Sequence, residues 1–369
     1  CREAETMKRK KTEIFLAGLL AAALVGCGGN VNSGDGSGQP AGESTGEEEI
    51  ELPNEEGKDY KYTNVEGLDV QPGTRIALVL KNLENSYWKA VKEGAEKAVE
   101  EINENLGYTG EDKVSLTVDG AEGEDGEAVD QQINTLDAVL SENPSALCLA
   151  AIDMQSCEAQ MEAAVESEIP VVILDSGIES DLVSAICRTD NEAAAAEAAD
   201  RLCERIGESG TVAVLSYSRR TETSMQRAQG FLQEIEENHP GVEVMEILFE
   251  DEEKSAAELW KQIQEEYPDL DGLFCTSSTV AVQVLDNLAE EQKVEIVSFD
   301  ADKEQLKAVR DGRLAGTICQ NPRGMGYTAV VAALRAASGE TVDREIDTGY
   351  QWLDRSSLED KSCEKYLYD

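Results

Sequence analysis

The sequence predicts an α/β protein built from two Rossmann-like lobes, each containing a doubly wound parallel sheet. From residue 74 onward, short apolar runs alternate with segments of helical spacing, a pattern typical of parallel sheets. Runs such as 171–174 are apolar throughout, as expected for strands with helices on both faces of the sheet. About ten such runs over roughly 300 residues exceed what one core usually holds, so we expect two lobes.

The first predicted strand covers residues 75–80, where aliphatic and β-branched residues follow one another. The other predicted strands are runs of the same kind at 113–118, 146–151, 170–174, 183–187, 210–216, 242–249, 271–276, 293–298 and 314–319.

The first predicted helix covers residues 86–101, where Trp88, Val91, Ala95 and Val99 share one face. The other predicted helices have the same spacing at 127–141, 155–168, 191–207, 222–238, 254–266, 279–290, 302–311 and 324–337. Helices therefore separate most of the predicted strands, as parallel pairing requires.

The first part of the chain has the features of an export signal. Met7 is followed by four basic residues and by an apolar run at 14–26 that ends before Cys27. This run is shorter than the roughly 20 apolar residues that span a bilayer. We therefore expect residues 1–26 to be a signal peptide, with 1–6 as extra residues upstream of it.

The composition changes after Cys27. Gly, Ser, Asn and Asp dominate the next residues, and an acidic stretch follows at 47–56. Such a composition buries too little apolar surface to order itself. The residues LVGC at 24–27 resemble the bacterial lipobox, and this resemblance implies that Cys27 is lipidated. We expect residues 27–73 to be a flexible acidic linker that begins at this cysteine.

Charge and histidine content exclude several functions. The chain has 76 acidic and 32 basic side chains and a formal net charge of −44, a field that repels nucleic acid. Its single histidine, His239, excludes multi-histidine metal sites and most histidine-dependent catalysis. We expect no metal, no cofactor and no catalytic residue.

The cysteines give a weaker indication. Without Cys1 and Cys27 their number is odd, and no pair has C-x-x-C spacing. Several lie in apolar runs, where a free cysteine behaves as a small hydrophobic residue. The sequence leaves one disulfide among them open.

In open α/β sheets, ligands bind beyond the carboxyl ends of the strands. The segments after the predicted strands contain aromatics, amides, single carboxylates and an arginine, without a G-x-S-x-G, Walker A or H-E-x-x-H motif. Aromatic faces and hydrogen-bonding side chains of this kind recognise neutral polyols. Asp153, after the third strand, is one such candidate, and a simple loop cap is the alternative for it.

Several motifs together resemble a known family. They are KNLENSYW at 81–88, IPVVILD at 169–175, RAQGF at 227–231, VSFD at 297–300 and DGRLAGTICQ at 311–320. In order and spacing the chain resembles the type I periplasmic-binding-protein family, specifically the ribose/galactose-like sugar receptors of ABC importers. The resemblance covers about 74–353 and implies two lobes joined by a three-segment hinge.

The resemblance also implies a ligand site. The matching positions are Asn85 for an amide, Tyr87 and Trp88 for ring-stacking aromatics, Asp175 and Asp300 for carboxylates, Arg227 for a guanidinium, and Gln320 for a hinge amide. Ser277 stands where the family pattern has an asparagine, and Ser176 where it has an arginine. Asp251 or Glu250 stands near the position of a second-lobe aromatic.

Each of these residues also has a purely structural interpretation. Trp88 could anchor the core, and Asp175 or Asp300 could cap a helix. Arg227 could form a surface ion pair with Glu222, and Gln320 could satisfy the backbone at a lobe crossing.

The resemblance implies an extracytoplasmic receptor, held at the bacterial cell membrane by its lipid. We expect 74–190 plus 320–344 to form the first lobe and 191–319 plus 345–369 the second. The lobes would close on a small neutral polyol, most simply a monosaccharide, and present it to an ABC transporter permease. The alternatives are a sensory receptor for a chemoreceptor or histidine kinase, and a ligand such as a cyclitol, nucleoside or signalling polyol.

Overall fold

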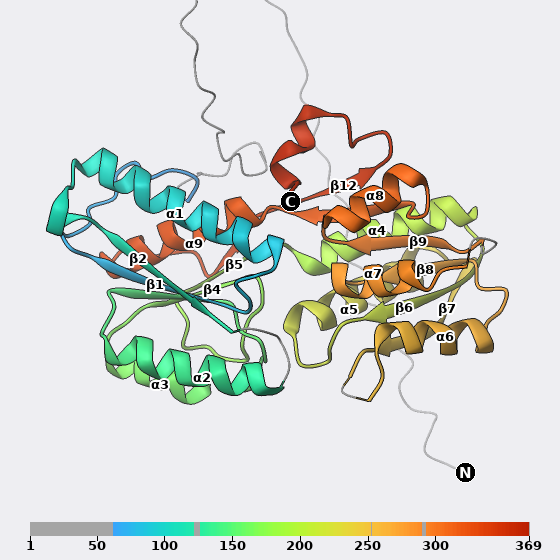
Figure 1. Ribbon diagram of the computed structural model, residues 1–369, viewed down its shortest axis with the longest axis horizontal. Coiled ribbons are helices and arrows are strands. Elements are labelled where there is room, and N and C mark those ends of the chain that lie inside the picture. The colour runs from blue at the N-terminus through green and yellow to red at the C-terminus, as the bar shows by residue number, and fades with distance from the viewer. Residues whose placement is uncertain (1–61, 122–125, 252, 290–292, 369) are drawn as a thin grey trace, which may run out of the picture. The chain divides into compact units, whose positions relative to one another are not determined.

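The computed structural model describes residues 62–368 apart from 122–125, 252 and 290–292. This part contains two six-stranded sheets with helices on both faces of each, so the predicted fold class is confirmed (Figure 1). The expected signal peptide, Cys27 and most of the expected linker lie outside the described residues.

The first sheet is parallel throughout and has the strand order β11-β5-β4-β3-β1-β2. Its strands are β1 (Arg75–Leu80), β2 (Ser115–Gly120), β3 (Ala146–Leu149), β4 (Val171–Leu174), β5 (Ala185–Arg188) and β11 (Glu345–Asp347). One face packs on α1 (Ser86–Leu106) and α9 (Pro322–Ala337), and the other on α2 (Gly126–Ser141) and α3 (Glu158–Glu166) (Figure 1). A short 3₁₀ helix, Gly110–Asp112, precedes β2.

The second sheet has the order β12-β10-β9-β8-β6-β7, and only β12 runs antiparallel to its neighbour. Its strands are β6 (Gly210–Ser216), β7 (Val242–Phe249), β8 (Gly272–Cys275), β9 (Glu295–Phe299), β10 (Gly316–Gln320) and β12 (Tyr350–Asp354). The helices α4 (Asn191–Ile206) and α5 (Glu222–Asn238) pack on one face. The helices α6 (Ala256–Glu266), α7 (Ser278–Asp286) and α8 (Lys303–Asp311) contribute to the core on the other.

The chain passes between the sheets three times: from β5 to α4, from β10 to α9, and from β11 to β12. The last passage lies later than expected. We expected residues from 345 onward to belong to the second lobe, but Glu345–Asp347 pairs with β5 of the first sheet. The strand is too short for its alternation to reveal which sheet it joins, and Gly349, at a φ of 74°, makes the turn into β12.

The expectation of a flexible linker is wrong for its last part. Tyr62, Val65, Leu68 and Val70 are buried against α1 and α9 in the first-lobe core. The Tyr62 hydroxyl also donates to Asp343 Oδ2 at 2.9 Å. These apolar side chains follow neither strand nor helix periodicity, so the sequence pattern did not distinguish them from the linker.

Other differences from expectation lie at element ends. Helix α1 continues five residues past the predicted end at 101, because Ile102 extends its buried stripe. It stops at Gly107, whose left-handed φ of 69° lets its N–H bond to the last carbonyls of the helix. In the described part of the chain, no helix combines the length and apolar character needed to cross a bilayer.

All seven described cysteines are free and buried. Burial raises the pKa of Cys148 to about 12, and burial with the nearby Asp153 carboxylate raises that of Cys157 to about 11. These thiols therefore remain protonated at neutral pH and unreactive.

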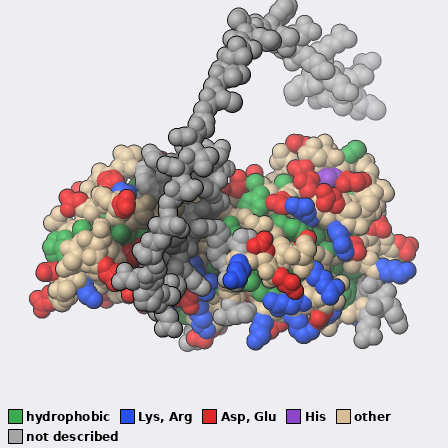
Figure 2. Space-filling view, turned by 90° about the horizontal axis from the view of Figure 1, so that it is seen from above, with side chains coloured by type: hydrophobic (Ala, Val, Ile, Leu, Met, Phe, Trp, Pro, Cys, Tyr) green, Lys and Arg blue, Asp and Glu red, His purple; other side chains and the backbone are tan. Residues whose placement is uncertain are grey.

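His239, at the end of α5, bridges two carboxylates. Its Nδ1 lies 2.8 Å from Glu208 Oε2 and its Nε2 lies 2.8 Å from Asp200 Oδ1. Figure 2 shows the single histidine side chain among acidic ones. Burial acts to lower the pKa of His239, but the hydrogen bonds and charges of Glu208 and Asp200 outweigh it, and the pKa is raised. The imidazolium form donates to both carboxylates.

We therefore expect His239 to make stability depend on pH. The folded-state pKa of His239 lies above its ordinary value of about 6.5. Its contribution to the free energy of unfolding is therefore complete below about pH 6.5 and is lost as the pH rises through the folded-state pKa. Urea unfolding of wild type and His239→Gln, followed from pH 5.5 to 8.5, measures this. The stability difference should shrink as pH rises, and a difference that grows with pH would contradict the assignment.

Candidate ligand site between the lobes

A small cavity lies where the carboxyl ends of the two sheets face each other. Its volume is about 80 Å³, well below the roughly 300–1,000 Å³ of drug-sized pockets. It is lined by Lys81, Asn85, Tyr87, Trp88, Asp175, Tyr217, Thr221, Thr223, Ser224, Arg227, Ser277, Ser278, Thr279, Asp300 and Gln320. Every residue expected at the ligand site except Asp153 is in this set.

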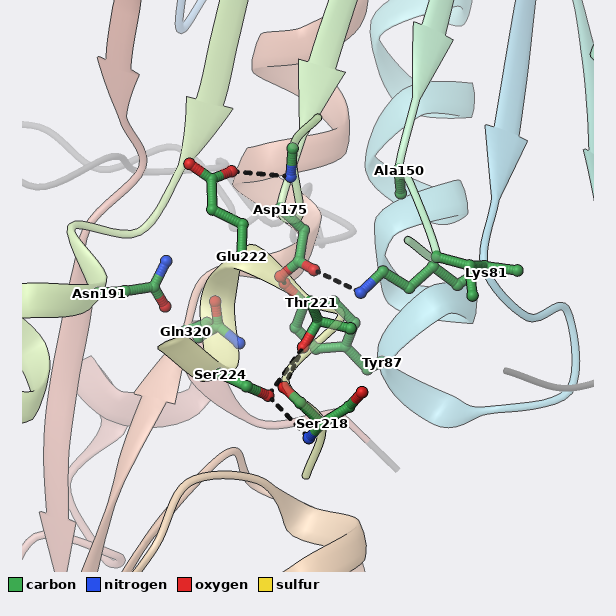
Figure 3. Close-up of polar contacts among 12 residues, drawn as sticks. Lys81, Tyr87, Ala150, Asp175, Asn191, Ser218, Thr221, Glu222, Ser224 and Gln320 are labelled. Carbon is green, nitrogen blue, oxygen red and sulfur yellow. Dashed lines mark hydrogen bonds and ion pairs between the residues drawn. The ribbon is translucent and has the colours of Figure 1, made fainter. Parts of the chain in front are cut away.

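Asp175 provides the carboxylate of the first lobe. It directly follows β4 and has a left-handed φ of 59°, a conformation that costs a non-glycine residue about 1–3 kcal/mol and is common at functional sites. The Tyr87 hydroxyl donates to its Oδ1 at 2.9 Å. Its other oxygen, Oδ2, faces Lys81 (Figure 3).

Lys81 is a buried lysine that was not expected at the site. It directly follows β1 and is only 4% exposed. Its Nζ lies 3.9 Å from Asp175 Oδ2 and 5.8 Å from the centre of the Trp88 ring, and it donates no hydrogen bond to any described residue. The 3.9 Å gap is too long for a hydrogen bond, but an oxygen between the two atoms could lie about 2.8 Å from each.

The start of α1 provides an amide and two aromatic rings. Asn85 caps the helix, and its Oδ1 accepts from the Tyr87 N–H at 2.7 Å. Its Nδ2 bonds to no described residue and is left for the cavity. The Tyr87 and Trp88 rings meet edge to face with centroids 4.9 Å apart. Trp88 is therefore both a core residue and part of the cavity wall.

Asp300 provides the second carboxylate, at the equivalent position in the other lobe. It directly follows β9 with a φ of 78°. Its Oδ1 accepts from Gln320 Nε2 at 2.8 Å and its Oδ2 from the Ser278 N–H at 3.1 Å. Burial raises the pKa of Asp300, although the nearby Arg227 charge and these hydrogen bonds act to lower it. Additional donors from a ligand would stabilise its ionised form.

Arg227 is an interior residue, so its interpretation as a surface ion pair is wrong. Its Nε donates to Asn191 Oδ1 at 2.8 Å and its Nη1 to the Thr276 carbonyl at 2.9 Å. The guanidinium lies 3.7 Å from the centre of the Phe299 ring. Its Nη2 bonds to no residue of the described chain. The proposed ion-pair partner, Glu222, instead binds Arg188 at 2.7 Å.

Gln320 and Ser277 complete the polar lining. Gln320 is the last residue of β10, and its Oε1 is buried without a hydrogen-bond partner among the described residues. Ser277 caps α7, with its Oγ accepting from the Val280 N–H at 3.4 Å, and it also faces the cavity.

Asp153 has a different position from the one expected. It lies outside the cavity lining, and its Oδ2 pairs with Arg220 Nε at 2.6 Å. Its Oδ1 accepts from the Gln155 N–H at 2.8 Å, which makes it the loop cap that was the alternative. Since Arg220 belongs to the second lobe, the ion pair joins the two lobes. A residue after a strand end can face either the cavity or its rim, and position alone does not separate the two.

Further contacts hold the lobes together around the cavity. Glu222 of the second lobe accepts from the Gly177 N–H at 3.0 Å, and the Ser86 hydroxyl donates to Asp302 Oδ1 at 3.1 Å. The Met154 N–H donates to the Arg220 carbonyl at 3.0 Å. The structure is therefore a closed arrangement of the lobes.

The cavity groups that have no hydrogen-bond partner among the described residues include both donors and acceptors. Lys81 Nζ, Arg227 Nη2 and Asn85 Nδ2 are donors, whereas Asp175 Oδ2 and Gln320 Oε1 are acceptors. A hydroxyl group can serve both because it donates once and accepts twice. The charged lining residues comprise two cations and two carboxylates. This arrangement suits an uncharged molecule with several hydroxyl groups.

Residues 76–341 match the family described as a periplasmic binding protein domain. The chain belongs to the periplasmic-binding-protein family. The resemblance inferred from the sequence is thereby confirmed, and the described lobes correspond to the two lobes of that fold.

Relatives in this family carry related names. The chain is 25% identical to the ribose import binding protein of Haemophilus influenzae, over 73% of this chain and 88% of the relative. It is 23% identical to the D-allose-binding periplasmic protein of Escherichia coli, over 75% of this chain and 89% of the relative. A solute-binding protein of Agrobacterium radiobacter, solved with D-arabinose, has a TM-score of 0.70 and 26% identity, covering 80% of this chain and 98% of the other.

Proposed function

We propose that this protein captures a neutral monosaccharide or a closely related polyol between its lobes and delivers it to the permease of an ABC transporter. The supporting observation is the Lys81–Asp175 gap, which fits a bridging hydroxyl, opposite the second carboxylate, Asp300. The relatives named for ribose and allose, and the neighbour holding D-arabinose, support the same ligand class.

We further propose that the protein is a lipoprotein outside the cytoplasm. The basic flank, the short apolar run and the Leu-Val-Gly-Cys sequence that ends at Cys27 support acylation of that cysteine. Palmitate labelling of wild type and Cys27→Ser tests this, and label that persists in the variant would contradict it.

Binding and closure would be one equilibrium. A ligand that contacts both Asp175 and Asp300 binds the closed form better than the open form, and it shifts the population by that difference alone. The interlobe contacts of Arg220 and Glu222 would form at the same time. The permease would then recognise the closed arrangement.

The departures from the family pattern bear on which sugar binds. Ser176, where an arginine was expected, is fully buried away from the cavity lining. Lys81 places a cation in the cavity from another strand instead. Asp251 accepts from the N–H groups of its own turn, and Tyr217 is the second-lobe aromatic that lines the cavity. We therefore expect a hydroxyl pattern specific to this protein.

Thermal and chemical unfolding with a panel of ligands tests the proposal. The panel contains neutral pentoses, hexoses and cyclitols, nucleosides, uronates and amino sugars. A ligand at 100 times its Kd stabilises by about 2.7 kcal/mol. We expect such a shift from at least one neutral polyol and none from the uronates or amino sugars. A charged compound as the best ligand, or turnover of the bound sugar, would overturn the proposal.

The Asp153–Arg220 ion pair should contribute modestly to affinity. Because Arg220 is half exposed, the pair is worth about 0.5–1 kcal/mol in the closed form, or a two- to fivefold higher Kd in Arg220→Met. The neighbouring Arg219 lies over the Phe249 ring and makes no ion pair among the described residues, so Arg219→Met is the control. Equal affinities of the two variants in titration calorimetry would show that the Asp153–Arg220 ion pair does not stabilise the closed form.

A further inference from the structure

We propose that the segment after β12, residues 355–368, is a positioning element of the ligand site. In this proposal Tyr368 fixes the positions of Asp175 and Asp300, the two carboxylates of the site, relative to each other. The proposal rests on the proposed function and adds to it a part of the chain beyond the matched family region, which ends at 341.

The last part of the segment is anchored in the interior, whereas residues 355–361 are exposed or partly buried. After a turn at Asp354 it forms a 3₁₀ helix, Lys361–Tyr366, and Cys363, Tyr366 and Tyr368 are all buried. These side chains belong to the core cluster formed by α1 and α9 of the first lobe, which also includes Ala301 and Leu306 of the second. Figure 1 shows this end of the chain close to the region where the two sheets meet.

An arginine of the first lobe fixes the end of the segment. Arg323 on α9 donates from Nη1 to the Leu367 carbonyl at 2.9 Å. Its Nε binds Glu93 Oε2 on α1 at 3.0 Å. The backbone just before Tyr368 is therefore held by α9 and, through Arg323, by α1, whose first turn contributes Tyr87 and Trp88 to the cavity wall.

Tyr368 contacts both lobes with one side chain. Its ring meets the Tyr87 ring edge to face, with centroids 5.6 Å apart. Its hydroxyl accepts from the Ala301 N–H at 3.0 Å. Tyr87 donates to Asp175, and Ala301 directly follows Asp300, so each contact is one step from a carboxylate of the site.

The chemistry of these contacts suits positioning. Asp300 has a left-handed backbone, and the bond to the next N–H fixes the peptide that leaves it. Burial raises the pKa of the Tyr368 phenol, and the Asp300 and Asp302 carboxylates raise it further. The phenol therefore stays neutral and keeps its contacts over the physiological pH range. Tyr368 does not line the cavity, so its effect must pass through Tyr87 and Asp300.

The variant Tyr368→Phe tests this, because it keeps the ring and removes the acceptor for the Ala301 N–H. Tyr366→Phe, in the same segment and equally buried, is the matched control. We expect Tyr368→Phe to raise the Kd of the best neutral sugar about five- to tenfold, and Tyr366→Phe to change it less than twofold. A change below twofold in Tyr368→Phe would overturn the proposal.

A purely structural role would lower stability without coupling to the site. A double-mutant cycle of Tyr368→Phe and Tyr87→Phe, read as ligand Kd, separates the two. We expect the combined effect to fall short of the product of the single effects, because both variants disturb Tyr87. Independent effects would reduce Tyr368 to a core residue.

A readout without ligand keeps this proposal separate from the proposed function. Because Tyr87 packs on Trp88, Tyr368→Phe should shift the Trp88 emission, isolated as the difference from matched Trp88→Phe proteins. If wild type binds no sugar, the proposed function fails, and this emission still decides the positioning role. An unchanged Trp88 emission would then overturn it.

Discussion

Asp175→Asn is expected to lower the affinity for the preferred neutral sugar by about 100-fold or more. The amide keeps the size of the side chain, but it replaces one acceptor oxygen with a donor. It is also uncharged, so Lys81 loses its counter-charge. Removing one partner of a buried ion pair costs about 3–5 kcal/mol. Part of this cost would appear in the binding free energy, because a ligand hydroxyl that bridges the pair would lose one of its partners. Titration calorimetry measures the change.

The control is a carboxylate of the same lobe outside the site. Asp181 is fully exposed, and its Oδ1 lies 4.0 Å from Arg344 Nη2, at the distance limit of an ion pair. Asp181→Asn should therefore leave the affinity unchanged. An affinity of Asp175→Asn within threefold of wild type would contradict the role of Asp175.

Arg227→Met is expected to abolish measurable binding and to lower the free energy of unfolding by about 3 kcal/mol. Methionine fills the space over Phe299, but it leaves the Thr276 carbonyl and Asn191 Oδ1 without a donor. Each buried acceptor left unsatisfied costs about 1–3 kcal/mol. The nearby Asp300 carboxylate would also lose the charge that acts to lower its pKa.

Arg227→Lys separates charge from geometry. Lysine keeps the positive charge but cannot donate along several directions while stacking on the ring. Urea unfolding and titration calorimetry should place it between wild type and Arg227→Met on both scales. Wild-type stability and affinity in Arg227→Met would show that the guanidinium is not part of the site.

The fold and most of the site were predictable because strand ends are visible in the sequence. Asp175 follows the fully apolar β4, and Asp300 follows the largely buried β9, and parallel sheets bring such ends to one edge. Lys81 follows β1 in the same way, yet the sequence cannot show that a lysine after a strand is buried rather than solvated.

Other features depend on packing that no local pattern encodes. The aliphatic side chains of residues 62–73 follow no regular period, and Tyr368 reaches Tyr87 only through tertiary structure. Asp153 and Asp175 both follow strands, but only the structure shows that Asp153 turns to the rim and meets Arg220. Sequence position therefore selects candidates, and the direction of each side chain separates them.

A crystal structure of the purified protein with its best-stabilising neutral sugar tests the central claim most directly. We expect the sugar in the cavity between the lobes, with one hydroxyl oxygen about 2.8 Å from both Lys81 Nζ and Asp175 Oδ2 and another group bonded to Asp300. A sugar bound elsewhere, or one in the cavity without contact to either carboxylate, would contradict the account.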